Sequence, residues 1–298
     1  MFPSVSLVLA GTALAAAQSG SLEGNEVLVA QILLDRAHHS PGVIDGKQGG
    51  NTSRAITAFE RGAGLHADGK LDPEVIRRLQ SSSQEPLFLD YQIQSEDVEG
   101  LVEVPASMVE QAKLDKLGYE TVVEALAERF HMGQDLLKRL NPDAGFKAGE
   151  TIRVVSPGKD ELGAKIARIE VDKALSQVRA LTAEGKMIAS YPATIGSNAF
   201  PSPSGTMEVR AVALEPKYYF DPENREWGPD KKLTIAAGPN NPVGSTWIDL
   251  TKEGYGIHGT PEPRLIGKTA SHGCVRLTNW DAAELGNAVE QGATVTFL

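Results

Sequence analysis

Apolar residues in the first part of the chain recur every three to four positions, the spacing that gives a helix one buried face. Between residues 25 and 80, three such segments alternate with Pro-Gly and Asp-Gly turns. Their apolar positions are Val27, Leu28, Ile32, Leu33, Ala55, Ile56, Phe59, Val75, Ile76 and Leu79. We expect Thr52 to cap the second helix, because a threonine hydroxyl accepts a backbone N–H there. The pattern predicts a three-helix bundle over residues 25–80.

A second helical pattern follows the polar stretch at residues 81–86. It predicts two short helices, one ending at Gly133 and the next near residues 141–142. A strand at Tyr91–Ile93, and a turn leading into a strand over Phe146–Val155, are expected to flank the helices. Residues 89–155 are therefore predicted to form a small βααβ module. We expect His131, at the end of its first helix, to lie on the solvated surface.

After a linker at residues 156–160 the pattern changes from helical spacing to alternation. Short alternating segments bounded by turn residues predict a mainly β domain over residues 163–298. One helix is expected after Thr278, which forms a capping-box pattern with Asp281. Its apolar face would be Ala282, Leu285 and Val289, and Gly292 would end it. Residues 211–238, which include Trp227, are expected to form a lid or groove wall.

Charge and composition narrow the classes of partner. The chain has 298 residues and a formal net charge of −10, which argues against binding nucleic acid or an anionic membrane. Its first residues form an apolar run ending in Ala15-Ala16-Ala17, which predicts a signal peptide over residues 1–17. The alternative is an unstructured start. No later segment approaches the ~20 apolar residues that span a bilayer.

The candidate chemistry gathers in one short stretch. Cys274 is the only cysteine, and His258 and His272 precede it. A thiol with a nearby imidazole is the minimum for acyl transfer through a cysteine nucleophile. Two histidines and one cysteine could also bind zinc, but His-Gly-Cys is not a usual ligand spacing. We therefore expect no metal and no cofactor.

The residues around Cys274 suggest how a reacting carbonyl could be held. Gly273 lets the backbone approach closely, and the N–H groups of Gly273 and Cys274 could form an oxyanion hole. The planar guanidinium of Arg276 could bind a substrate carboxylate with two hydrogen bonds. An ion pair with a purely structural role is an equally good interpretation of this residue.

The segments Ile257–Thr260 and Ser271–Leu277, with Asn279, closely resemble the L,D-transpeptidases, cysteine enzymes of bacterial cell-wall synthesis. The resemblance extends over residues 165–298 and implies a β-sandwich-like catalytic fold. It implies that Cys274 is the nucleophile. His258 would be the general base, oriented by a backbone carbonyl near Gly259. Ser271, His272 and Gly273 would shape the oxyanion and acyl site.

The two N-terminal units also resemble known modules. Residues 25–80 are similar to the three-helix peptidoglycan-binding domain through Ile44-Asp45-Gly46, Phe59 and Ala67-Asp68-Gly69. Residues 89–155 resemble the glycan-binding lysin motif, with a plain βααβ spacer as the alternative. The partners implied are peptidoglycan stem peptides and glycan, with carbapenem-type inhibitors. The resemblance implies that the protein is secreted across the inner membrane and lies in the periplasm or at the cell wall.

The reaction implied by the resemblance has two steps. Cys274 forms a thioester with a stem tetrapeptide and releases D-Ala, and an amine acceptor then gives a 3→3 cross-link. Water as acceptor would make the enzyme an L,D-carboxypeptidase, and a protein lysine would make it an anchoring transpeptidase. Two further hypotheses are weaker. A non-catalytic wall-binding protein would not need the intact Cys and His motif, and papain-like proteases carry the Cys before the His.

Overall fold

The computed structural model describes residues 24–159, 161–224 and 228–298. The predicted signal peptide at residues 1–17, and Trp227, lie outside the described residues. No helix among the described residues is long and apolar enough to cross a membrane.

The N-terminal unit is the predicted three-helix bundle. Its helices are α2 (Glu26–Arg36), α3 (Gly50–Ala63) and α4 (Pro73–Ser82), and Leu34, Ile56 and Leu79 are fully buried between them. The prediction for Thr52 was wrong, because α3 begins at Gly50 and Thr52 lies inside it. The Thr52 hydroxyl is buried and accepts a 3.1 Å hydrogen bond from Gln31, so it joins α3 to α2.

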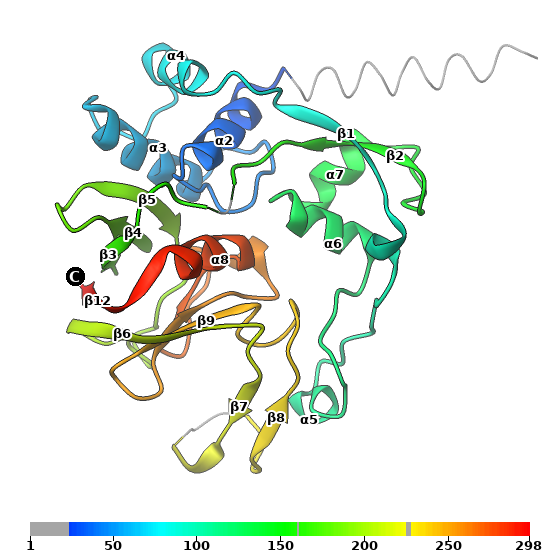
Figure 1. Cartoon of the computed structure of the whole chain (residues 1–298), viewed down its shortest axis with the longest axis vertical. Coiled ribbons are helices and arrows are strands. Elements are labelled where there is room, and N and C mark those ends of the chain that lie inside the picture. The colour runs from blue at the N-terminus through cyan, green and yellow to red at the C-terminus, as the bar shows by residue number, and fades with distance from the viewer. Residues whose placement is uncertain (1–23, 160, 225–227) are drawn as a thin grey trace, which may run out of the picture.

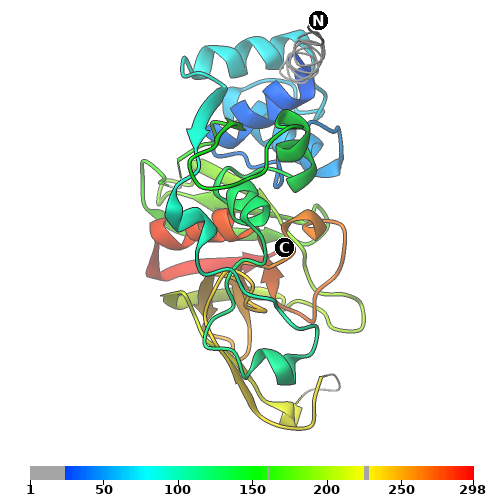
Figure 2. The ribbon, with the colours of Figure 1, turned by 90° about the vertical axis from the view of Figure 1, so that its right-hand side faces the viewer.

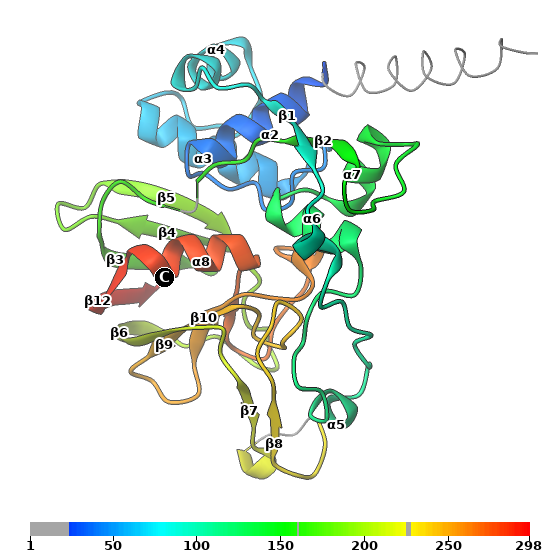
Figure 3. The same cartoon turned by 45° about the vertical axis from the view of Figure 1, so that its right-hand side comes forward.

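The middle unit has the predicted order of strands and helices. Strands β1 (Phe88–Gln92) and β2 (Thr151–Val155) pair antiparallel, with Tyr91 opposite Ile152. Between them lie α6 (Val122–Arg129) and α7 (Gln134–Leu140). A long arm precedes α6 and carries two short helices, η1 (Ser95–Val98) and α5 (Met108–Gln111). The arm extends away from the module, as Figure 3 shows.

The C-terminal unit is mainly β, as predicted, and is built on one curled eight-stranded sheet with the order β11-β10-β9-β6-β12-β3-β4-β5. Thr194, just beyond β5, forms two backbone hydrogen bonds with Arg276 of β11, at 2.8 and 2.9 Å. The two edge strands therefore meet. The strands are β3 (Ile166–Asp172), β4 (Gln177–Leu181), β5 (Met187–Pro192), β6 (Gly205–Leu214), β9 (Thr246–Leu250), β10 (Gly256–His258), β11 (Val275–Arg276) and β12 (Val289–Phe297).

The helix expected after Thr278 is α8 (Asn279–Ala288), and it packs Ala282 and Leu285 into the sheet's core. The Thr278 hydroxyl accepts the N–H of Asp281 at 3.1 Å, as an N-cap should. The expected C-terminal end was wrong, because Val289 begins β12 and Gly292 lies within that strand. The strand pairing with β3 starts at Val289, which draws this residue out of the helix.

A hairpin and two single-turn helices complete the unit. Strands β7 (Tyr218–Phe220) and β8 (Leu233–Ile235) form a hairpin that projects from the sheet beside the arm carrying α5 (Figures 1 and 2). The single-turn helices η2 (Pro222–Asn224) and η3 (Pro263–Leu265) lie in the hairpin and after β10.

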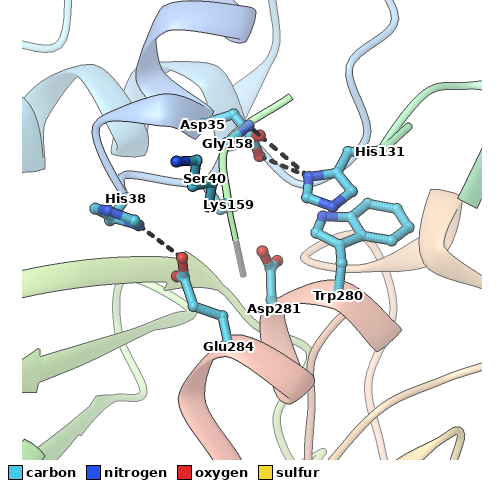
Figure 4. Close-up of a pocket in the computed structure, with 9 residues that line it drawn as sticks. All are labelled: Asp35, His38, Ser40, His131, Gly158, Lys159, Trp280, Asp281 and Glu284. Carbon is cyan, nitrogen blue, oxygen red and sulfur yellow. Dashed lines mark hydrogen bonds and ion pairs between the residues drawn. The ribbon is translucent and has the colours of Figure 1, made fainter. Parts of the chain in front are cut away.

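The three units contact each other through buried polar groups. His39 of the bundle lies 3.0 Å from the hydroxyl of Ser190 in β5, and His38 lies 2.6 Å from Glu284 of α8. His131 is not on the surface as expected. It is buried, lies 3.1 Å from Asp35 and stacks on Trp280 (Figure 4). The units therefore pack directly against one another, although polar segments at residues 81–86 and 156–160 connect them in the sequence.

Candidate active site

Cys274 directly precedes β11, the strand that pairs in parallel with β10. The register sets Ile257 opposite Val275 and His258 opposite Arg276. Side chains alternate between the two faces of a sheet, so Ile257 and Val275 point into the core. His258 and Arg276 consequently share the other face, and Cys274 lies one residue before this strand pair. The cysteine side chain is partly exposed, as a nucleophile must be.

The loop ahead of Cys274 is held by two serine hydroxyls. Ser271 donates to the carbonyl of Cys274 at 2.5 Å and accepts the N–H of Gly273 at 3.1 Å. Ser202 donates to the carbonyl of Gly273 at 2.7 Å. Gly273 has φ +115°, a conformation that L side chains rarely adopt. Ser271 thus fixes the backbone of Gly273 and Cys274, and the N–H of Gly273 is already hydrogen-bonded to the Ser271 hydroxyl.

His258 is buried, and its surroundings fix both its tautomer and its charge. Its Nδ1 lies 2.6 Å from the carbonyl oxygen of Gly259, which can only accept, so Nδ1 carries the proton. Nε2 is then the basic atom of the neutral ring. Burial lowers the pKa of His258 to about 4 and the positive charge of Arg276 acts in the same direction, while the backbone hydrogen bonds to Gly259 and Val243 act against that shift. The imidazole is therefore neutral near pH 7, as a general base must be.

Trp247 forms the wall of the His258 pocket. It lies directly opposite His258 across the β9–β10 ladder, and the two rings stack with centroids 5.4 Å apart. A side chain at Gly256 would come within 2.5 Å of the indole. Gly256 therefore leaves the space that Trp247 needs to cover the imidazole.

Asn279, the first residue of α8, holds the turn that follows His258. Its Oδ1 accepts the N–H groups of Thr260 at 3.0 Å and Ser245 at 3.2 Å. A Cβ on Gly259 would come within 2.1 Å of this same oxygen, so the turn needs glycine there. Asn279 is part of the motif that pointed to the family, but its contacts depend on two distant loops and were not predictable from spacing.

Arg276 and His272 differ in their surroundings. The Arg276 side chain is half-buried, and burial lowers its pKa, while the charges of Cys274 and Tyr218 act against that shift. Its guanidinium thus lies within electrostatic reach of the thiol and of the β7–β8 hairpin. His272 is exposed, and its ring packs against Phe200 with centroids 4.8 Å apart.

Among the described residues, no three His, Cys, Asp or Glu side chains are gathered in a way that could hold a metal ion. The two groups at the centre of the site, a buried neutral imidazole and a partly exposed thiol, are those of a cysteine acyl-transfer site.

Comparison with known proteins agrees with this chemistry. The YkuD model, described as "L,D-transpeptidase catalytic domain", matches residues 166–297, and "Putative peptidoglycan binding domain" matches residues 23–79. The chain is 29% identical to "Putative L,D-transpeptidase YkuD" of Bacillus subtilis over 58% of this chain and 92% of that protein. It is 40% identical to "Probable L,D-transpeptidase YbiS" of Escherichia coli over 26% of this chain and 24% of that protein.

Solved structures of the same name are also similar. An L,D-transpeptidase from Mycobacterium smegmatis aligns with a TM-score of 0.36 and 20% identity, over 50% of this chain and 63% of that chain. L,D-transpeptidase 3 from Mycobacterium tuberculosis, solved with a faropenem-derived adduct, aligns with a TM-score of 0.38 and 16% identity, over 50% and 74%. The sequence matches carry the assignment: residues 166–297 form an L,D-transpeptidase catalytic domain, and residues 23–79 ahead of it match the peptidoglycan-binding domain family.

Proposed function

We propose that Cys274 is the nucleophile and His258 the general base of this cell-wall L,D-transpeptidase. One observation carries the proposal: Cys274 directly precedes β11, the strand that pairs in parallel with the strand of His258, and the Nδ1 of His258 is committed to the Gly259 carbonyl. That leaves Nε2 as the atom that takes the thiol proton. Burial keeps this nitrogen unprotonated near pH 7.

The first step is acylation. The thiol of Cys274 gives its proton to Nε2 of His258, and the sulfur attacks the carbonyl that links the diamino acid of a stem tetrapeptide to its terminal D-Ala. The C–N bond breaks, a thioester forms, and the proton passes from Nε2 to the amine of the departing D-Ala. The Cys274 N–H contributes to the oxyanion hole, and His272 at the mouth of the site contacts the acyl group. The Arg276 guanidinium binds a substrate carboxylate.

The second step transfers the acyl group to an acceptor. An amine of a neighbouring stem attacks the thioester, Nε2 takes its proton, and the thiolate leaves and is reprotonated. The product is a 3→3 cross-link. Water in place of the amine gives carboxypeptidase activity, and a protein lysine gives an anchored protein. The peptidoglycan-binding domain keeps the enzyme among stem peptides, which are the acyl donors in all three reactions.

The test is mass spectrometry of muropeptides after incubating the purified full-length chain with disaccharide tetrapeptides. We expect 3→3 dimers and one D-Ala released per dimer. Tripeptides without dimers would favour the carboxypeptidase. Unchanged tetrapeptides, with protein shown to be folded, would contradict the proposal.

The location follows from the wall-binding domain. The protein acts at the cell wall, after export through the predicted signal at residues 1–17. Full-length protein should sediment with insoluble peptidoglycan and not with an unrelated polysaccharide such as cellulose. Equal sedimentation with both would remove the wall-binding role. Carbapenems would acylate Cys274 in place of the stem peptide.

A further inference from the structure

Glu128 of the middle unit reaches into the catalytic unit. It lies in the last turn of α6, and its Oε1 accepts a 2.9 Å hydrogen bond from the side-chain amide of Asn279. The hydroxyl of Tyr119, also in the middle unit, donates to the same oxygen at 3.0 Å. The carboxylate is therefore held from its own module and presented to α8.

The Asn279 amide makes its full set of bonds only with Glu128 in place. Oδ1 accepts two backbone N–H groups, and Nδ2 donates to the carbonyl of Pro239 at 3.1 Å and to Glu128. Two N–H groups can meet only an oxygen, and the Pro239 carbonyl can meet only an N–H₂; Oε1 of Glu128, which also accepts from Tyr119, meets the same N–H₂. The four partners thus fix which way the amide faces, and Glu128 is one of the two that hold Nδ2.

The Asn279 amide holds the same peptide plane that orients His258. The peptide unit between Gly259 and Thr260 is trans, so its C=O and N–H point in opposite directions from one rigid plane. The N–H, on Thr260, donates to Asn279 at 3.0 Å. The C=O, on Gly259, accepts from Nδ1 of His258 at 2.6 Å. A rotation of Asn279 would therefore tilt the carbonyl that sets the imidazole's position.

We propose that Glu128 is a positioning residue for catalysis, which acts through Asn279 and the Gly259–Thr260 peptide on His258. The middle unit is then part of the catalytic machinery as well as a spacer or glycan-binding module. The inference rests on the proposed role of His258.

The test uses the full-length chain with three variants. Glu128→Leu removes the acceptor, whereas Glu128→Gln retains an oxygen that can accept from Asn279. Glu124→Leu is the matched control. Glu124 lies on the same helix and binds Asn240 of the catalytic unit at 2.8 Å, so it tests loss of an interdomain contact that does not involve Asn279.

We expect Glu128→Leu to lower kcat at least tenfold with little change in KM, since a small misplacement of a catalytic group is costly. The rate at which iodoacetamide alkylates Cys274 near pH 7 should fall in parallel. Glu128→Gln should restore both to within about threefold of wild type, and Glu124→Leu should match wild type. If Glu128→Leu is not folded, Glu128→Asp replaces it, because its shorter side chain cannot reach Asn279.

Equal values for Glu128→Leu (or its replacement) and Glu124→Leu would overturn the inference, as would equal losses in Glu128→Leu and Glu128→Gln. Failure of the proposed function looks different. In that case His258→Ala would also leave kcat and the alkylation rate unchanged.

Discussion

The indole of Trp247 covers the imidazole of His258, with ring centroids 5.4 Å apart and planes inclined by 23°. The two residues are register partners on the paired strands β9 and β10, so the sheet itself fixes the indole against the imidazole. The indole keeps water from the ring and thereby contributes to the burial that lowers the pKa of His258 to about 4.

Opening this wall should change the pH dependence. Trp247→Ala admits water, so the pKa of His258 should rise toward its ordinary 6.5. The base would then be protonated in moderately acidic solution, and the acid limb of kcat/KM should move to higher pH by a unit or more. Trp247→Phe keeps an aromatic ring there, so the acid limb of its kcat/KM profile should stay close to that of wild type. An acid limb that does not move in Trp247→Ala would show that the indole does not set the base's pKa.

The two histidines of the motif should behave differently. His258 is buried beside the thiol strand, so His258→Ala should slow alkylation of Cys274 near pH 7 and cost about 10²–10⁴ in turnover. His272 is exposed against Phe200, so His272→Ala should impair peptide turnover and spare the reactivity of the thiol. Iodoacetamide rates measured against pH decide between them. If the pKa of the thiol rises only in His272→Ala, then His272 and not His258 is the general base.

Ser271 should matter for stability as well as for turnover. Its buried hydroxyl braces both Gly273 and Cys274, so Ser271→Ala leaves two backbone groups without this partner. We expect a loss of about 1–3 kcal/mol in the free energy of unfolding, with a lower kcat. Ser204→Ala is the control, since its hydroxyl binds Lys173 at the exposed surface. Chemical denaturation of both variants measures the difference, and equal stabilities would remove the bracing role.

The junction between the units should make stability depend on pH. Asp281 of α8 is buried among Ser40, Asp35 and His131, with one carboxylate oxygen lacking a hydrogen-bond partner (Figure 4). Burial raises the pKa of Asp281 to about 8. The folded state therefore binds a proton that the unfolded state releases above about pH 4, and this contribution to stability is lost as pH rises toward 8.

The expected slope for this one group is about 1.4 kcal/mol per pH unit between pH 5 and 7. Buried His39, whose pKa burial lowers to about 4, works the other way and loses stability as pH falls below 6.5. The informative quantity is thus the difference between wild type and Asp281→Asn in urea denaturation. We expect the variant to gain relative to wild type from pH 5 to pH 7. A constant difference would mean that Asp281 is ionised throughout.

The sequence predicted the local elements better than their contacts. Helical spacing located all three helices of the bundle, and alternation located the β domain, because both patterns depend on which face is buried. Thr52 was misplaced because capping residues and buried hydroxyls look alike in a sequence. His131 was assigned to the surface because its partners, Asp35 and Trp280, lie in two other units.

The candidate site divides in the same way. Cys274 and His258 stand in two short segments, Ser271–Leu277 and Ile257–Thr260, and the family resemblance implied the carbonyl near Gly259. Trp247, Ser202 and Glu128 were not predictable, because each reaches the site from a distant segment. Their contacts arise from sheet register and from packing between units, which no local spacing encodes.

The most direct test of the account is intact-protein mass spectrometry after exposure to a carbapenem. If Cys274 is the acylated nucleophile, wild type should gain the mass of one inhibitor molecule, and peptide mapping should place it on Cys274. Cys274→Ala, shown to be folded by its circular dichroism, should gain nothing. An adduct on the Cys274→Ala variant, or no adduct on folded wild type, would contradict the assignment of Cys274.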